Sequence, residues 1–122
     1  MFINLVFDYK IMKSYEILKG YINKLNSSEQ IKSETKGIQI IFQFKNDAGE
    51  SYYLQFKEDG SGEIVMGEHP SPTVVLTAKE DDLAGIVEGS IDGTKAFFMG
   101  KLKIKGDPFL AQKLVNIVKK LK

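Results

Sequence analysis

The segment of residues 96–107, near the end of the chain, constrains the fold more than any other part of the sequence. It begins with an apolar cluster at 96–99, which a glycine ends, and continues with strict alternation of lysine and aliphatic residues over 101–105. Such alternation is typical of a strand with one buried face. Asp107 then precedes Pro108, the combination of an N-cap and a first-turn proline. The segment therefore predicts the end of a helix, a strand and the start of a second helix in direct succession.

Length and composition bound the class of protein. The chain has 122 residues, of which 43% are hydrophobic and 27% charged, and this suits one globular domain over residues 1–122. Its net charge is +1, and all 17 basic residues are lysine. The chain therefore lacks the guanidinium groups that bind phosphates and base edges in a bidentate manner. We expect no nucleic-acid partner.

Residue types that support catalysis or metal binding are scarce. Cysteine is absent, which excludes disulfides, thiolate nucleophiles and cysteine-based zinc sites. The single histidine, His69, lies in a proline-rich loop where an exposed side chain is expected. The acidic pair Asp81 and Asp82 falls at a predicted helix start, where negative charge complements the helix dipole. We therefore predict no catalytic residues, no metal site and no cofactor, and a protein that is not an enzyme.

Periodicity divides the rest of the chain into helices and strands. Apolar residues spaced i, i+4, i+7, i+11 and i+14 predict a first helix over residues 11–25, and the polar stretch after it has room for a short helix around Ile31. Period-two alternation predicts four strands, at residues 38–45, 52–57, 64–66 and 73–78. Tight turns at 46–49 and 58–62 join the first three strands, which predicts an antiparallel meander.

Two further helices are expected before the alternating segment. Residues 77–80, Thr-Ala-Lys-Glu, match a capping box, in which the threonine oxygen accepts a backbone N–H and the glutamate reaches back. The helix that follows would end at Gly89. Asp92 is expected to cap a second short helix through residues 96–99.

The last helix, which Asp107 is expected to cap, carries more apolar surface than one contact requires. Its apolar residues form two adjacent stripes, together wider than the ~100° that a surface helix needs. The stripes consist of Leu110, Leu114, Ile117 and Leu121, and of Ala111, Val115 and Val118. One stripe can pack on the sheet, and the other needs another helix, another subunit or a ligand. The pattern alone leaves these three open.

Three lysines, Lys101, Lys103 and Lys105, share one face of the alternating strand. One interpretation is a solvated face, or an edge strand that charge protects against aggregation. Another is a basic stripe for a fatty-acid carboxylate, an acyl-carrier phosphate or an anionic membrane. Both interpretations fit the spacing.

Residues 96–107, continued by Leu110-Ala111 and Lys113-Leu114, closely resemble the signature of the sterol carrier protein family, the non-specific lipid-transfer type. In that pattern an Ala-Phe-Phe helix end is followed by Gly-Lys-Leu-Lys-Ile-Lys-Gly. Asn or Asp then begins a Leu-Ala-x-Lys-Leu helix. Each of these positions is matched here, and the order of the predicted elements agrees over essentially the whole chain.

The resemblance implies an α+β domain with a five-stranded, mostly antiparallel sheet, helices covering one face, and an apolar tunnel between the two layers. In the family this tunnel holds a fatty acid, fatty acyl-CoA, phospholipid or sterol. The positions of this chain that match the tunnel are Leu83, Ile86, Val87, Phe97, Phe98, Leu102, Ile104, Leu110 and Leu114. The implied function is to bind and transfer a lipid, with transient membrane contact.

The resemblance also leaves alternatives. The chain could be an accessory or scaffold protein that presents a polyprenyl or acyl intermediate to a partner enzyme, and its oligomeric state is open. The sequence ends Lys120-Leu121-Lys122 rather than in the Ser-Lys-Leu type of peroxisomal tail, which favours a prokaryotic-type member and a cytoplasmic location. No apolar run approaches the ~18 residues of a membrane span. The stretch 27–37 is longer than in animal relatives, so the tunnel mouth near it is undefined.

Overall fold

A long amphipathic helix, α2 (Lys13–Asn26), begins the part of the chain that the computed structural model describes, residues 12–122. Its apolar face is buried at the predicted helical spacing, by Leu18, Ile22 and Leu25. The first helix is thereby confirmed. Ile11, which completes the sequence pattern, lies outside the described residues.

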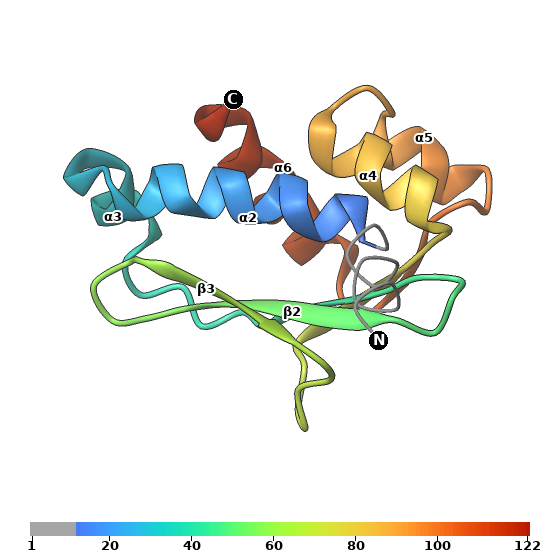
Figure 1. The fold of residues 1–122 in the computed structure, drawn as a ribbon, viewed down its shortest axis with the longest axis horizontal. Coiled ribbons are helices and arrows are strands. Elements are labelled where there is room, and N and C mark those ends of the chain that lie inside the picture. Colours follow the sequence, from blue (N-terminus) through green and yellow to red (C-terminus); the bar gives the residue numbers. More distant parts are fainter. Residues whose placement is uncertain (1–11) are drawn as a thin grey trace, which may run out of the picture.

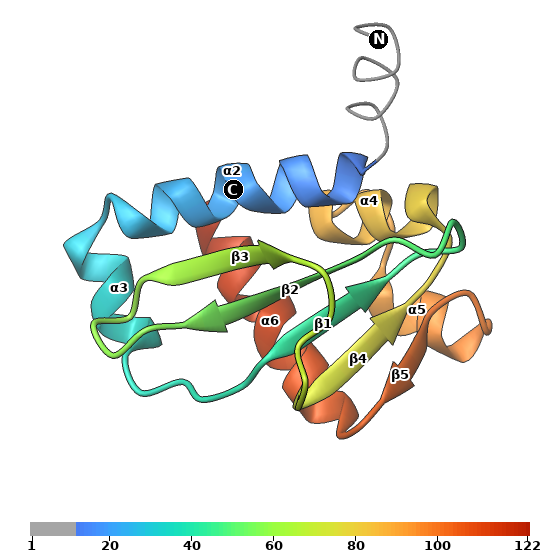
Figure 2. The same cartoon turned by 60° about the horizontal axis from the view of Figure 1, so that its bottom comes forward.

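Five strands form one sheet in the order β3-β2-β1-β4-β5 (Figure 2). The strands are β1 (Phe42–Lys45), β2 (Ser51–Phe56), β3 (Gly62–Met66), β4 (Val74–Thr77) and β5 (Lys103–Lys105). The first three form the predicted antiparallel meander, and β5 is antiparallel to β4. β1 and β4 run parallel, so the sheet is mostly antiparallel with one parallel pair. The predicted α+β fold with five strands is confirmed.

The connection between β3 and β4 explains the parallel pair. It crosses the face of the sheet on which no helix of residues 12–122 lies, seen below the sheet in Figure 1. Gln43 lies on that face and is 1% exposed. Both polar atoms of its side-chain amide form hydrogen bonds with the connection. Its Nε2 donates to the carbonyl of Gly67 at 3.0 Å, and its Oε1 accepts from the backbone N–H of His69 at 2.8 Å. Because the chain crosses the sheet here, β4 enters beside β1 in the same direction.

The helices of the described residues lie on the other face (Figures 1 and 2). The remaining helices are α3 (Glu29–Thr35), α4 (Glu80–Glu88), α5 (Gly93–Phe98) and α6 (Pro108–Leu121). Asp92 and Asp107 cap α5 and α6 as predicted: a carboxylate oxygen of each accepts backbone N–H groups of the first helical turn. Gly89 ends α4 with a left-handed φ of 96°. The apolar core lies between this helical layer and the sheet.

Three local predictions were wrong. The alternation that starts at residue 38 does not pair until Phe42, because residues 38–41 diverge from β2 and line a surface groove with residues 55–58. The strand predicted over 101–105 is shorter, since only Lys103–Lys105 pair with β4. The capping box at 77–80 does not form.

The start of α4 is held by distant residues instead. Thr77 is the last residue of β4, and the N-cap, Lys79, makes no side-chain capping bond. The Glu80 N–H donates to Asp47 Oδ1, in the β1–β2 turn, at 3.1 Å. The Glu80 carboxylate accepts from the Ser14 N–H at 2.6 Å and from Asn46 Nδ2 at 2.9 Å. The glutamate therefore ties α4 to α2 and to the hairpin rather than to its own N-cap.

Tyr52 extends this network into the core. Its ring is 1% exposed, stacks on Phe44 at 4.8 Å, and its hydroxyl donates to Ser14 Oγ at 2.7 Å. Burial raises the pKa of the Tyr52 phenol well above its usual value. The folded protein therefore holds this proton more tightly than the unfolded chain, so the stabilisation is complete below about pH 10 and is lost as pH rises further.

We expect Tyr52→Phe to lower the free energy of unfolding by about 1–3 kcal/mol at pH 8, because the buried Ser14 hydroxyl loses its partner. The same variant should lose less stability than wild type between pH 8 and pH 11. Urea unfolding at both pH values measures this. Tyr53→Phe, on the opposite face of the same strand, should keep the wild-type alkaline loss. An equal loss in Tyr52→Phe and wild type would contradict the assignment.

Candidate functional site

An apolar cavity of about 320 Å³ lies between the sheet and helices α4, α5 and α6. Its wall consists of Phe44, Leu76, Leu83, Ile86, Gly93, Thr94, Phe97, Phe98, Leu102, Ile104, Pro108, Phe109, Ala111, Gln112, Leu114 and Val115. Among the described residues, the side chains of Thr94 and Gln112 are its polar groups, and no ionisable side chain lines it. Such a wall can exclude water from an alkyl chain and offers no acid, base or nucleophile beyond one hydroxyl.

A tight turn between α4 and α5 positions one side of this wall. Gly89 reverses the chain, and the Ile91 N–H donates to the carbonyl of Gly85 at 3.0 Å. A side chain at Gly85 would overlap the Ile91 side chain, so the absence of a Cβ lets the turn fold back onto α4. This close return places Ile86 of α4 and Phe97 of α5 on the same cavity wall.

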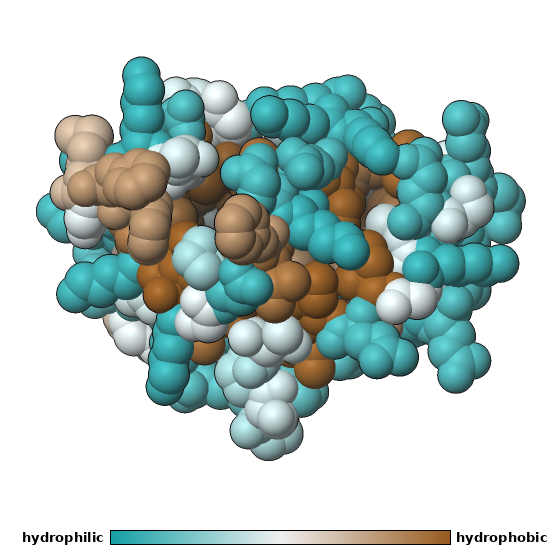
Figure 3. All heavy atoms as spheres, turned by 180° about the vertical axis from the view of Figure 1, so that it is seen from behind, coloured by the Kyte–Doolittle hydropathy of each residue, from teal (hydrophilic) through white to brown (hydrophobic). Residues whose placement is uncertain are grey.

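The cavity opens to solvent between the end of α5 and the start of α6. Phe98 is 80% exposed and Phe109 is 82% exposed, although both line the cavity. The rings of Phe97 and Phe98 meet edge to face with centroids 5.5 Å apart, so the aromatic wall continues from the half-buried interior to the surface. Figure 3 shows a hollowed face on which apolar surface lies exposed between hydrophilic side chains.

A second cavity of about 470 Å³ adjoins the first along α6. The two share several wall residues: Ile86, Gly93, Thr94, Gln112, Leu114 and Val115. The second cavity is more polar, and its lining includes Asp92, Lys119 and Lys122. The Asp92 carboxylate is already used to cap α5.

The structure brings most of the sequence-predicted site residues together. Seven of the nine line the first cavity: Leu83, Ile86, Phe97, Phe98, Leu102, Ile104 and Leu114. Val87 lines the second cavity. Leu110 is not among the lining residues of either cavity and packs, half-buried, against the core. This placement is geometric, and the role of these residues in ligand binding stays a prediction.

His69 lies away from the cavity. Its Nδ1 accepts from the Ser71 N–H at 2.9 Å, and its ring packs edge-on against Tyr53 with centroids 5.0 Å apart. Tyr53 pairs with Gln43 on the helix-free face of the sheet, whereas the cavity lies on the helix side. His69 therefore orders the β3–β4 connection.

Other chemical features of residues 12–122 are equally limited. No three His, Asp or Glu side chains in this range gather as a metal site would require. Within the same range, no helix combines the length and the apolar character needed to cross a membrane. Lys103 and Lys105 are exposed on β5, which is an edge strand of the sheet.

Comparison with known proteins agrees with this geometry. The family model described as the SCP-2 sterol transfer family matches residues 20–119. The chain belongs to the SCP-2 sterol transfer family. Among its relatives in this family, a fatty acid-binding protein of Yarrowia lipolytica is 34% identical, covering 78% of this chain and 80% of the relative. An oleate-induced peroxisomal protein of Candida maltosa is 30% identical, covering 87% and 84%.

Solved structures extend the comparison to the fold. Sterol carrier protein 2 of Yarrowia lipolytica, in its apo form, has a TM-score of 0.64 at 28% identity, covering 86% of each chain. The Aedes aegypti sterol carrier protein 2 complex with palmitate has a TM-score of 0.71 at 19% identity, covering 91% of this chain and 98% of the other. A ubiquinone synthesis protein shares the fold at 14% identity, with a TM-score of 0.61 and coverage of 77% and 79%.

Relatives that are named as enzymes carry the SCP-2 domain as one part of a larger chain. Peroxisomal multifunctional enzyme A of Dictyostelium discoideum is 34% identical over 87% of this chain, which covers 24% of that protein. The family resemblance predicted from the 96–107 segment is thereby confirmed, and the domain itself is a lipid-binding domain rather than a catalytic one.

Sequence reasoning missed several residues of the SCP-2 cavity, chiefly Phe44, Leu76 and Phe109. Phe44 and Leu76 read as core residues in their strands, and both are indeed buried, so no local signal separates them from the rest of the core. The second stripe of α6 did carry a signal. One of the two stripes was expected to need an apolar partner beyond the sheet, and Ala111 and Val115 of the second stripe line the cavity, as does Leu114 of the first.

Proposed function

We propose that this protein binds a long-chain lipid, such as a fatty acid, fatty acyl-CoA, phospholipid or sterol-like molecule, and transfers it without catalysis. The observation that carries the proposal is the cavity between sheet and helices, whose described wall is apolar and holds no ionisable side chain. Membership of the SCP-2 sterol transfer family and a relative named as a fatty acid-binding protein support it. We propose that residues 1–122 act as one such domain.

The nine residues predicted from the sequence, Leu83, Ile86, Val87, Phe97, Phe98, Leu102, Ile104, Leu110 and Leu114, are proposed to serve this site. Eight would contact the ligand from the two adjoining cavities, and Leu110 would support the wall from the core side. Each buried CH₂ group is worth about 0.8 kcal/mol, so a long acyl chain has on the order of 10 kcal/mol of gross binding energy. Ordering the chain offsets part of this gain.

A non-enzymatic role is favoured by where the reactive groups lie. His69 is on the helix-free face and its Nδ1 is occupied by the Ser71 N–H. General acid–base catalysis requires a titratable group within hydrogen-bond reach of the reacting atom. No described residue of the first cavity provides such a group, and in the second cavity the Asp92 carboxylate already accepts the N–H groups that cap α5.

Two other expectations from the sequence stay predictions. The cytoplasmic location competes with a peroxisomal one, because a relative from Candida maltosa is named as a peroxisomal protein. The accessory or scaffold role has as its support a fold likeness to a ubiquinone synthesis protein at 14% identity. Lipid binding is therefore the function we test.

A chain-length series tests the proposed function directly. We expect the dissociation constant of delipidated protein for saturated fatty acids to fall about tenfold for every two added CH₂ groups, until the chain outgrows the cavities. Displacement of a fluorescent fatty acid measures it. The α,ω-dicarboxylic acid of equal length is the matched ligand, and it should bind far more weakly because its second carboxylate would be buried without a partner. No dependence on chain length, or equal binding of both acids, would contradict the proposal.

The same ligands should stabilise the fold. A hundredfold excess of free fatty acid over its dissociation constant is expected to add about 2.7 kcal/mol to the free energy of unfolding. Thermal unfolding of the delipidated protein with and without ligand provides this second measurement.

A further inference from the structure

The mouth of the cavity exposes large apolar side chains to solvent. Phe98, Met99 and Phe109 are 80%, 67% and 82% exposed, and Met66 is the fourth exposed large hydrophobic residue in the described range. Single exposed apolar residues are ordinary on protein surfaces, but a group of them marks a contact surface. Three of the four here belong to the end of α5 and the start of α6, on either side of the opening. We call these three residues the rim.

Lysines surround the rim. Lys95 precedes Phe98 by three residues on α5, and Lys113 follows Phe109 by four on α6, so each lies on the same helix face as its aromatic neighbour. Both lysines are exposed, as is Lys101 between the two helices. No salt bridge within residues 12–122 involves any of these three lysines.

The positive charge is concentrated in this segment. Residues 93–113 contain five lysines and one aspartate, a net charge of +4, whereas the whole chain has a net charge of +1. The rest of the chain therefore carries −3. Lys95, Lys101 and Lys113 flank the rim and attract an anionic partner to it, whereas Lys103 and Lys105 alternate with the cavity-lining Ile104 and face the other side of β5.

We propose that the rim docks on an anionic lipid bilayer. Exposed apolar side chains such as Phe98, Met99 and Phe109 can bury their surface at the boundary between lipid headgroups and acyl chains, while lysines beside them stay among the headgroups. Each lysine near an anionic bilayer strengthens binding by about fivefold. A second copy of this chain is a poor occupant, because a symmetric contact would bring two rims of like charge together.

Docking in this orientation has a consequence for lipid exchange. Phe98 and Phe109 line the cavity and form the rim at the same time. A bilayer in contact with the rim would therefore face the cavity opening, and an acyl chain could enter it without crossing water. This inference rests on the proposed function, but docking and ligand affinity are measured independently.

The test compares matched pairs of variants in a vesicle sedimentation assay. The rim variants are Phe98→Ser with Phe109→Ser, and Lys101→Gln with Lys113→Gln. The controls are Met66→Ser, exposed on β3, and Lys36→Gln with Lys57→Gln, which remove the same charge at the α3 end of the molecule (Figure 2). Vesicles contain equal amounts of phosphatidylcholine and phosphatidylglycerol, or phosphatidylcholine alone. Fatty-acid affinity without vesicles is measured for every variant.

We expect wild type to bind the anionic vesicles, to be released by salt, and to bind phosphatidylcholine alone much more weakly. The lysine pair at the rim should lose about tenfold or more of this binding, with fatty-acid affinity unchanged, because these lysines do not line the first cavity. The control pair, Lys36→Gln with Lys57→Gln, should bind the anionic vesicles about as strongly as wild type does.

Three results would overturn the docking proposal. If the wild type does not bind anionic vesicles, the bilayer is excluded, and an acidic protein becomes the partner of the rim. Equal losses of vesicle binding in the rim variants and the control variants would show that binding depends on net charge and not on the rim. A wild-type dimer in light scattering that the rim variants convert to monomer assigns the rim to a second copy. None of these results alters the fatty-acid affinity, so the proposed function stands or falls separately.

Discussion

Replacing Ala111 by tryptophan should weaken the binding of a long-chain fatty acid about 100-fold. Ala111 lies half-buried on α6 and lines the first cavity, so a large side chain there projects into the space that we assign to the ligand. Displacing three to four CH₂ groups of ligand costs about 3 kcal/mol at 0.8 kcal/mol per group, and this corresponds to about 100-fold in the dissociation constant. Titration of the delipidated variant with a fluorescent fatty acid measures the loss.

The smaller substitution Ala111→Phe should give an intermediate loss of affinity, because it fills less of the cavity. Ala48→Trp is the matched control, since Ala48 is exposed in the β1–β2 turn and lines neither cavity. The control should bind the fatty acid as wild type does. Wild-type affinity in both Ala111 variants, with the fold intact by circular dichroism, would place the ligand elsewhere.

Replacing Gly60 by alanine should lower the free energy of unfolding by about 2–5 kcal/mol. Gly60 has a left-handed φ of 91°, and a Cβ at this position would overlap the backbone carbonyl of Lys32 in α3. The conformation costs an alanine about 1–2 kcal/mol, and the overlap with a backbone atom adds about 1–3 kcal/mol. Urea unfolding measures the sum.

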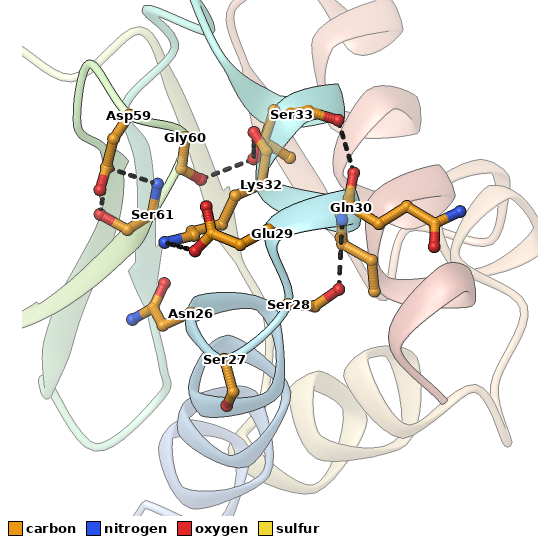
Figure 4. A network of polar contacts seen from close by, with 12 residues as sticks. Asn26, Ser27, Ser28, Glu29, Gln30, Lys32, Ser33, Asp59, Gly60 and Ser61 are labelled. Atoms are coloured by element: carbon orange, nitrogen blue, oxygen red, sulfur yellow. Dashed lines mark hydrogen bonds and ion pairs between the residues drawn. The ribbon is translucent and has the colours of Figure 1, made fainter.

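The surroundings of Gly60 explain why this contact cannot relax easily (Figure 4). Its carbonyl accepts from the buried Thr35 hydroxyl at 2.6 Å, which holds α3 against the β2–β3 turn. Asp59 accepts from both the N–H and the hydroxyl of Ser61, at 2.9 and 2.6 Å, and these bonds lower the pKa of its carboxyl group. The Lys32 ammonium pairs with Glu29 at 2.7 Å.

Gly49→Ala separates the two contributions to the Gly60 effect. Gly49 has a similar φ of 79° in the β1–β2 turn, but nothing lies within 4 Å of the position that a Cβ would take. This variant should therefore cost only about 1–2 kcal/mol, the price of the left-handed conformation. An equal loss of unfolding free energy in Gly60→Ala and Gly49→Ala would show that the overlap with the Lys32 carbonyl contributes nothing to the loss.

Local signals in the sequence succeeded where the interaction itself is local. Asp92 and Asp107 cap their helices through N–H groups two and three residues away, so the cap lies within one short segment of sequence. Gly89 ends α4 for the same kind of reason, because its conformation depends on the absence of its own side chain. The predicted capping box at 77–80 failed because Glu80 is bound by Ser14 and Asn46, far away in the chain.

The sequence by itself determined the periodicity of α2 and α6, the antiparallel meander and the family, since steric preference, amphipathic spacing and a short motif all act between near neighbours. Only the tertiary structure decided that β4 runs parallel to β1, and that Phe44 and Leu76 of the sheet face Ala111 and Phe109 of α6 across a cavity. Whether two apolar surfaces close on each other or leave space depends on how far apart the layers are held. That separation depends on contacts between the two layers, such as Tyr52 of β2 with Ser14 of α2 and Glu80 of α4 with the β1–β2 turn, which join residues that no local pattern connects.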